Sequence, residues 1–345
     1  MSSQIPPGTV ELLPGTLKPE SFYELKVPAS VEIIAPKALA DVKMNKISFT
    51  ADSRLRELGR EACRGLPLYD FTAPASLRAI GQGAFAECKS MREVRLNEGL
   101  ETVGKDEYGP HKKPLEGAFQ HTWVERAFLP STLRRIEYAA FRGCPVLRTI
   151  ALPSGLRFIG ARAFSESGLQ TLEIPRTVQK IGERAFAGCR QLRELFVDVG
   201  SALQGLGEGA FEDTALKTAH LPEDLGVEIG AKALRGAKIV RLPSGKLKIG
   251  PKSLVEWREA RFVRLPDDIS AIGDYWFTRA RVEELHVPAS VSKIGVCAFL
   301  GCTGLRSVTV EVGSALSEIE EGAFSECQAL KRAYLPADMN SGVRE

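Results

Sequence analysis

Cysteine has the greatest chemical capability in this sequence, since thiolates bind metal ions and carry out redox reactions. Five of the seven cysteines lie three residues after a phenylalanine: Cys88, Cys144, Cys189, Cys302 and Cys327. A zinc site needs two or more ligands that converge locally, as in a C-x-x-C pair, and the sequence contains no such pair. We therefore predict that these thiols are buried and structural, and that no metal ion is bound.

Histidine and glycine motifs give no better candidate for catalysis. His111, His121, His220 and His286 belong to no H-E-x-x-H or H-x-x-C motif, and the sequence has no G-x-S-x-G segment. The segment "GLGEG", residues 205–209, resembles half of a nucleotide-binding loop, but it follows no strand of a βαβ unit. The sequence thus predicts no catalytic residue and no cofactor, and we do not expect an enzyme.

A regular period explains most of these motifs. Pro153 and Pro175 are 22 residues apart, as are the pairs Ala163-Phe164 and Ala185-Phe186. The repeating unit is L-x-x-[IV]-x-[LIV]-P-x-x-[LV]-x-x-I-G-x-x-A-F-x-x-C, and about fourteen copies follow one another. Several copies lack the proline, as in "LFVDVGSALQGLG". The cysteines and glycines are therefore positions of the repeat before they are candidate sites.

The first part of each copy reads as a strand. In "LQTLEIP", Leu172 and Ile174 alternate with Thr171 and Glu173, which is the period-two pattern of a strand with one buried face. Pro175 then ends the strand, because proline has no N–H group to donate to a neighbouring strand.

The second part of each copy reads as a turn that returns the chain to the next strand. Val178 and Ile181 point inward, Gly182 allows a tight turn, and Phe186 lies in the core on a short turn or helix. A unit of this length cannot bury its own apolar side, so stacked copies must bury one another. The fold class predicted is an α/β repeat solenoid, with a parallel β-sheet on one side and short helices or turns on the other.

The unit resembles the leucine-rich repeat of the BspA-like (Treponema-type) family, whose pattern is similar to "LPSGLRFIGARAFSESGLQTLEIP" at residues 152–175. The resemblance extends over essentially the whole chain. It implies a curved solenoid with the parallel sheet on its concave face. It also implies binding roles, which in some bacterial and protist members include surface adhesion to host proteins.

One interruption breaks the period. We predict a single domain over residues 1–345 with an insertion at residues 104–117, "GKDEYGPHKKPLEG", where about ten extra polar residues must leave the stack. Insertions in solenoids often lie on a binding face, and a tolerated surface loop explains the segment equally well.

The outward strand positions are the candidates for function, since the fold asks little of them. Parallel strands lie about 4.8 Å apart, so outward residues of consecutive copies form columns, and one group would make a patch about 20 Å long. Its composition of aromatic residues, arginine and histidine is typical of binding hot spots, although exposed strand positions also favour aromatic residues for pairing alone. The predicted patch consists of Phe196, His220, Arg241, Phe262, Arg264 and His286.

Charge and the N-terminal segment limit the class of partner. The net charge of +3, from 46 basic and 43 acidic residues, does not favour nucleic acid or a membrane surface as partner. No apolar run is long enough to span a membrane, and the N-terminal segment lacks the features of a secretory signal. We therefore expect a cytoplasmic location, with the cell surface as the alternative.

Two functional hypotheses follow from these patterns. The first is a non-catalytic scaffold that binds a protein or peptide partner through the concave face, with no nucleic acid and no insertion into a membrane. The alternative is a BspA-like surface or secreted adhesin that binds host or matrix proteins. An enzyme would need a convergent polar pocket at the insertion or at a chain end. The oligomeric state is left open.

Overall fold

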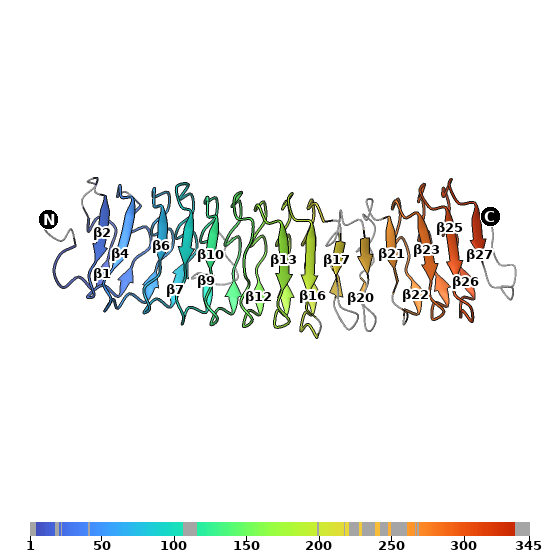
Figure 1. The fold of residues 1–345 in the computed structure, drawn as a ribbon, viewed down its shortest axis with the longest axis horizontal. Helices are drawn as coiled ribbons and strands as arrows, with labels where there is room; N and C mark the ends of the chain where they lie inside the picture. Colours follow the sequence, from blue (N-terminus) through green and yellow to red (C-terminus); the bar gives the residue numbers. More distant parts are fainter. Residues whose placement is uncertain are drawn as a thin grey trace. The chain divides into compact units, whose positions relative to one another are not determined.

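The computed structural model of the chain describes residues 5–17, 21, 23–40, 42–105, 116–198, 200–216, 218–220, 228–229, 239–241, 248–249, 261–265, 267 and 269–334. The chain divides into two compact units, residues 1–170 with 185–190 (unit 1) and residues 171–184 with 191–345 (unit 2). Each unit is a stack of rungs, and one rung corresponds to one copy of the repeat (Figure 1). A single domain over residues 1–345 stays a prediction.

Each rung has three sides, and two of them are parallel β-sheets. The long-strand side carries the predicted strand. In unit 1 it comprises β2 (Glu24–Val27), β4 (Lys46–Phe49), β6 (Asp70–Thr72), β8 (Glu93–Arg95) and β10 (Arg126–Phe128). In unit 2 it is one eight-stranded sheet of β13 (Thr171–Ile174), β15 (Glu194–Val197), β17 (Thr218–His220), β19 (Ile239–Arg241), β21 (Phe262–Arg264), β23 (Glu284–Val287), β25 (Ser307–Val310) and β27 (Arg332–Tyr334).

The short-strand side is a second parallel sheet that the sequence analysis did not predict. Most of its strands have two residues and lie where the pattern reads x-I-G. In unit 1 they are β1 (Glu11–Leu12), β3 (Ile33–Ile34), β5 (Glu57–Leu58), β7 (Ala79–Gly81), β9 (Thr102–Lys105), β11 (Arg135–Ile136) and β12 (Phe158–Ile159). In unit 2 they are β14 (Lys180–Ile181), β16 (Gly205–Leu206), β18 (Glu228–Ile229), β20 (Lys248–Ile249), β22 (Ala271–Ile272), β24 (Lys293–Ile294) and β26 (Glu318–Ile319).

On the third side, the turn side, the sequence predicted short helices or turns, and the described residues form turns. No helix occurs in the part of the chain that the structure describes. Alternate N–H groups on this side donate to the next rung instead, as from Glu61 to the Gln82 carbonyl at 2.9 Å and from Cys63 to the Ala84 carbonyl at 2.8 Å. In an α-helix these donors would bond four residues back within the same rung. Turns therefore close each rung, and the fold is a solenoid of parallel strands stacked in coils.

Left-handed residues prevent helix formation on the turn side. Glu61, with φ of 54°, and Gly65, with φ of 72°, flank Cys63, and most sister positions in the other described rungs also have positive φ. A residue with positive φ interrupts the run of right-handed backbone angles that a helix requires. Residues other than glycine pay about 1–2 kcal/mol for this conformation. The rung-to-rung hydrogen bonds and the buried core must outweigh that cost.

A ladder of phenylalanine rings fills the core beside the turn side. The ring centroids are 5.1 Å apart for Phe85 and Phe119, 5.2 Å for Phe119 and Phe141, and 5.5 Å for Phe141 and Phe164. All four side chains are fully buried. The insertion lies between Phe85 and Phe119, yet their rings stack like the others, so the ladder continues across it. Residues 106–115 of the predicted insertion lie outside the described residues.

The glycine of the I-G pair serves close approach between rungs, which differs from the predicted role in a tight turn. Gly160 and Gly207 do not have positive φ. A Cβ atom on Gly160 would lie 2.6 Å from the Glu137 carbonyl carbon of the preceding rung, and one on Gly207 would lie 2.4 Å from the Glu183 nitrogen. A side chain at these positions would therefore push neighbouring rungs apart.

The left-handed geometry predicts an unusual effect of glycine at Arg162, where φ is 55°. Replacing Arg162 by glycine should give a free energy of unfolding about 1 kcal/mol higher than replacing it by alanine, because glycine adopts positive φ without steric cost. Chemical denaturation of Arg162→Gly and Arg162→Ala measures the difference.

Arg157 provides the matched control, because it is an exposed residue without positive φ. There the order should reverse, with Arg157→Gly less stable than Arg157→Ala. The same order at both positions would contradict the left-handed geometry of the turn side.

Candidate partner-binding face

The long-strand side presents two outward positions on each strand. In β13, Thr171 and Glu173 are exposed while Leu172 and Ile174 are buried, and β15 and β23 repeat this alternation. Because the inward residues fill the core, the outward residues are not needed to hold the rung together. The outward positions are therefore where the sequence is free to carry binding groups.

Two residues of the predicted patch have described side chains. Phe196 in β15 is 38% exposed, which is unusual for so large an apolar group. His286 in β23 is exposed, and its Nε2 lies 3.3 Å from Glu311 Oε1. The other carboxylate oxygen of Glu311 accepts a hydrogen bond from the Ala289 N–H at 2.8 Å. His286 is thus held in place beside a carboxylate that is itself anchored to the backbone.

The other four residues of the predicted patch are placed by backbone register alone, since their side chains lie outside the described part. Phe196 pairs with His220, and Arg264 pairs with both Arg241 and His286. Phe262 lies two residues before Arg264 in β21, in the adjacent outward column. The sheet therefore brings all six positions to one face of unit 2, and their role in binding stays a prediction.

Unit 1 contains an outward cluster that the sequence analysis did not select. Arg95 in β8 pairs in register with Phe128 in β10, and the Arg95 guanidinium carbon lies 4.1 Å from the centre of the Phe128 ring. The Glu93 carboxylate accepts a hydrogen bond from Arg95 Nε at 2.6 Å and forms an ion pair with Arg126 Nη2 at 2.7 Å. We call Glu93, Arg95, Arg126 and Phe128 the unit 1 patch. Phe128 is 43% exposed, so its apolar ring is accessible to a partner beside the paired charges of Glu93, Arg95 and Arg126.

Exposed aromatic side chains continue beside the unit 1 patch. The Arg92 guanidinium carbon lies 5.4 Å from the centre of the Trp123 ring, and Arg92 Nε lies 3.6 Å from a Glu125 carboxylate oxygen. Trp123 is 45% exposed and Tyr69 is 63% exposed. The Arg92 N–H donates to the Tyr69 carbonyl at 2.8 Å, which places the two residues on neighbouring rungs.

The short-strand side offers a useful comparison. Arg135 in β11 pairs in register with Phe158 in β12, and the Arg135 guanidinium carbon lies 4.3 Å from the centre of the Phe158 ring. An arginine over a phenylalanine therefore does not by itself distinguish the two sides. What differs is the number of outward positions, because a two-residue strand presents one and a strand of three or four residues presents two.

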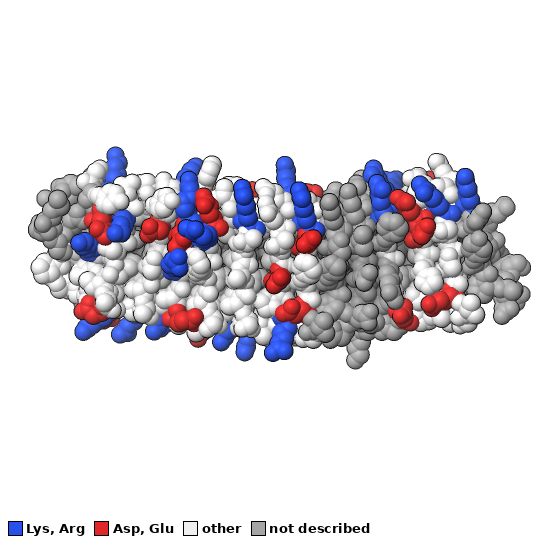
Figure 2. Space-filling model, viewed as in Figure 1, with Lys and Arg blue, Asp and Glu red and all other residues white. Residues whose placement is uncertain are grey.

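The charges on the described surface are mixed in sign. Figure 2 shows lysine and arginine side chains along the edges of the rungs with acidic side chains among them. Many are paired across rungs, such as Lys46 with Glu24 at 3.1 Å. A surface of this kind favours a partner with matched charges of both signs over a uniformly charged polymer.

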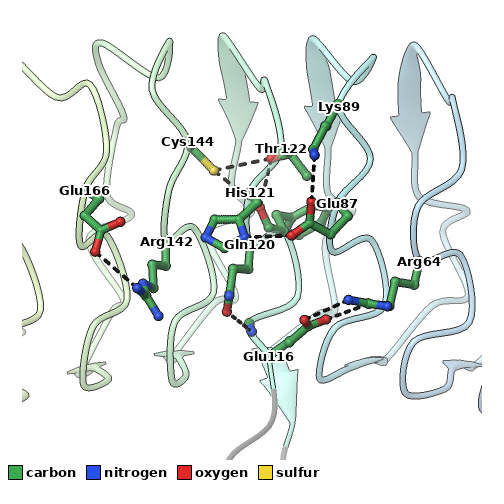
Figure 3. A network of polar contacts seen from close by, with 12 residues as sticks. Arg64, Glu87, Lys89, Glu116, Gln120, His121, Thr122, Arg142, Cys144 and Glu166 are labelled. Atoms are coloured by element: carbon green, nitrogen blue, oxygen red, sulfur yellow. Dashed lines mark hydrogen bonds and ion pairs between the residues drawn. The ribbon is translucent and has the colours of Figure 1, made fainter.

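The turn side of unit 1 carries a network of polar contacts that forms a second candidate site (Figure 3). Arg64 forms two hydrogen bonds to Glu116, at 2.7 and 3.0 Å. Glu87 accepts from His121 Nδ1 at 2.7 Å and from Lys89 at 3.2 Å. Lys89 pairs with Glu87 within one rung, whereas His121 and Arg64 pair with carboxylates of other rungs. The pairs share no common centre, so they stabilise the stack and do not form a catalytic group.

The hydrogen bonds to Glu87 together lower the pKa of its carboxyl group more than burial raises it. Partial burial acts to raise the pKa of its carboxyl group, but the hydrogen bonds from His121 and Lys89 hold that pKa below the ordinary value. The charged form of Glu87 is therefore the form that the folded rungs favour.

Four of the five cysteines that were predicted to be buried are buried, and Cys327 is the exception. Cys63, Cys88, Cys144, Cys189 and Cys302 are buried, whereas Cys297 and Cys327 are half-buried, and all seven are free thiols. Burial raises the pKa of Cys88 to about 12 and the pKa values of Cys144 and Cys189 to about 11. Each of these three thiols donates to a main-chain carbonyl of the preceding rung, as Cys189 does to Phe164 at 3.1 Å.

The described residues contain no group of three or more side chains that could hold a metal ion. Within the same residues, no helix has the length and apolar character needed to cross a membrane.

The chain matches a protein-family model over most of its length. The BspA type leucine-rich repeat region matches residues 16–109, 115–240 and 227–342 in six copies. No match was found among curated proteins.

Several solved structures are similar to the chain. A leucine-rich repeat protein from Bacteroides ovatus has 21% sequence identity and a TM-score of 0.49, over 76% of this chain and 74% of that one. A leucine rich cell surface protein from Faecalibacterium prausnitzii has 18% identity and a TM-score of 0.39, over 93% and 80%. A leucine-rich repeat protein from T. pallidum has 19% identity and a TM-score of 0.33, over 52% and 76%.

The lowered pKa of Glu87 predicts a specific loss of stability in acid. A carboxyl group whose folded pKa is depressed stabilises the fold above its unfolded pKa, about 4.3, and this contribution disappears as the pH falls through the folded value. Glu87→Gln should therefore lower the free energy of unfolding at pH 7, and the deficit should shrink below about pH 4. Denaturation at a series of pH values measures it.

His121→Asn tests the same contact from the other partner, since asparagine tolerates the positive φ of 56° at this position. It should cause part of the neutral-pH deficit of Glu87→Gln, since Lys89 still contacts the carboxylate, and this deficit should decline below about pH 4. A deficit that grows as the pH falls below about 4 would contradict the assignment.

Proposed function

The chain belongs to the BspA-type leucine-rich repeat family, and we propose that it is a non-catalytic scaffold that binds a protein or peptide partner through its long-strand side. Binding to proteins is general for leucine-rich repeats, and this family is in general non-catalytic. The absence of catalytic groups in this chain stays a prediction.

The lengths of the strands in the two sheets favour the long-strand side as the binding surface. In unit 2 the strands of the long-strand side have three or four residues, whereas those of the short-strand side have two. A longer strand presents two outward columns, which gives a partner a grid of side chains in place of a single row. In this proposal the long-strand side is the concave face that the family resemblance implies.

The composition of the outward columns supports protein recognition. Phe128 and Phe196 are exposed apolar rings, and Arg95 is held over Phe128 by its contact with Glu93. Interface hot spots are enriched in arginine and in aromatic residues such as tryptophan and tyrosine, and a side chain held in place before binding loses less entropy when the partner arrives. The unit 1 patch and the predicted patch are thus two anchor regions of the same kind.

The mixed charges support a protein or peptide over nucleic acid as the partner. A nucleic-acid surface needs a stripe of unpaired basic side chains. On the long-strand side of unit 1, Arg95 and Arg126 share the carboxylate of Glu93. The proposal places the partner in the cytoplasm, and a surface or secreted adhesin with a host or matrix protein as partner is the competing assignment.

Matched variants on the two sides test the proposal. Arg95→Ala with Phe128→Ala removes the stack on the long-strand side, and Arg135→Ala with Phe158→Ala removes the equivalent stack on the short-strand side. Arg241→Ala, Phe262→Ala and Arg264→Ala together test the predicted patch. The partner is first captured by wild-type protein from cell lysate and, in parallel, from a panel of extracellular matrix proteins, and its Kd is then measured with each purified variant.

Loss of hot-spot residues should weaken binding by at least about tenfold in the long-strand variants and leave the short-strand variant unchanged. Circular dichroism confirms that each variant is folded. Equal binding of the partner by all variants, or weaker binding by the short-strand variant alone, would contradict the proposal. Capture only from the matrix panel would move the assignment to the adhesin.

A further inference from the structure

The third residue after the repeat phenylalanine contacts its counterpart in the next rung at two places in unit 1. In unit 1, Thr122 Oγ1 lies 3.3 Å from Cys144 Sγ, and Ser167 Oγ lies 3.2 Å from Cys189 Sγ. From Cys88 to Thr214 this position alternates between a thiol and a hydroxyl. The solenoid therefore brings whatever polar atoms occupy this position on neighbouring rungs to contact distance.

Cys302 and Cys327 are the one place in the sequence where two successive copies carry cysteine at this position. Their rungs are in register, because the Phe299 N–H donates to Ala323 at 2.7 Å and the Gly301 N–H donates to Ser325 at 2.8 Å. The rings of Phe299 and Phe324 stack at 5.2 Å beside them.

One carbonyl group fixes both cysteines. The Phe299 oxygen accepts the Cys302 N–H at 3.1 Å and the Cys327 thiol at 3.2 Å. Adjacent rungs with the strand spacing of about 4.8 Å fall within the Cα separation of about 4.4–6.8 Å that a disulfide requires. The backbone is therefore already positioned for a bond between these two sulfur atoms.

We propose that Cys302 and Cys327 form a redox-active dithiol, a modification site at which a peroxide converts the pair to a disulfide between neighbouring rungs. Cys327 is the attacking residue because it is half-buried, whereas Cys302 is fully buried. The site is independent of the partner-binding face, since it lies among the turns that follow the repeat phenylalanines.

The chemistry balances with hydrogen peroxide as the oxidant. The Cys327 thiolate attacks one peroxide oxygen, the O–O bond breaks, and the departing hydroxide takes up a proton to leave as water, which gives a sulfenic acid on Cys327. The sulfur of Cys302 then attacks the Cys327 sulfur, the S–O bond breaks, and the proton of Cys302 leaves with the hydroxide as a second water. Two electrons pass from the two sulfur atoms to the peroxide, which is reduced to water.

The protonation of the pair supports this division of roles. The hydrogen bond between the two thiols, together with burial, raises the pKa of Cys302, and the same hydrogen bond lowers the pKa of Cys327. The thiolate is the reactive form of cysteine, so the accessible member of the pair is also the one that ionises first. Cys189 contacts the hydroxyl group of Ser167 at the equivalent position, where a second thiol would be needed to form a disulfide.

Oxidation should have a mechanical consequence for unit 2. A bond between residues 302 and 327 closes a loop of about 25 residues, which restricts the unfolded chain and raises the midpoint of denaturation. The last described rungs would thus be more resistant to unfolding in an oxidising environment than in a reducing one.

Peptide mapping after peroxide treatment tests the proposal. The folded, reduced protein is exposed to graded hydrogen peroxide, quenched with an alkylating agent and digested, and the expected product is a peptide pair linked through Cys302 and Cys327. In Cys302→Ala the sulfenic acid on Cys327 should persist and react with dimedone. Alanine is already present at this position as Ala280, one rung earlier, so the variant should fold.

Cys327→Ala should abolish the reaction at this site, and Cys189→Ala, a matched thiol from unit 1, should leave it unchanged. A linked product that contains Cys297 instead, or oxidation of Cys327 to sulfinic acid in wild-type protein without any linked peptide, would overturn the proposal. If Cys302→Ala does not fold, the peptide map of wild-type protein decides the question, because the presence or absence of the linked peptide pair shows directly whether the disulfide forms.

Discussion

The hydrogen bond from the repeat phenylalanine to the next rung is the interaction on which the structure depends. Its length is 2.7 Å at Phe119, Phe141 and Phe164 in unit 1 and at Phe277 and Phe299 in unit 2. The bond fixes the distance between rungs on the turn side, so the phenylalanine rings stack and both sheets are held in register. The left-handed residues on either side are the conformational cost of directing these donors along the stack.

This regular stacking separates residues that hold the fold from residues that are free to act. The inward positions of the long-strand side, such as Leu172 and Ile174, fill the core, while outward positions such as Phe128 stand exposed. Equivalent positions in neighbouring rungs become neighbours in space, so a residue type repeated in two copies acts as a pair. Binding anchors and the dithiol of Cys302 and Cys327 arise in this way from one geometric rule.

Much of the rung was predictable from the sequence because period-two and period-22 patterns reflect burial directly. The strand at 171–174, the buried Phe186 and the buried Cys189 followed from those patterns. Short helices or turns were predicted on the turn side, and the described residues form turns. The sequence did not decide between the two, because the positive φ of residues such as Arg184 has no signature in residue type. The contact of Arg95 with Phe128 was not predicted, because the insertion separates the two strands in the sequence. Residues 148–152 fit the strand pattern but form no strand, and the contacts do not explain this difference.

Scalar coupling through a hydrogen bond, measured by NMR on deuterated protein, tests the account most directly. The account predicts coupling between the Phe141 amide nitrogen and the carbonyl carbon of Ala163, one rung ahead, because that N–H donates across the rungs. Coupling of Phe141 to the carbonyl of Glu137, four residues back in its own rung, would show a helix on the turn side and contradict the account.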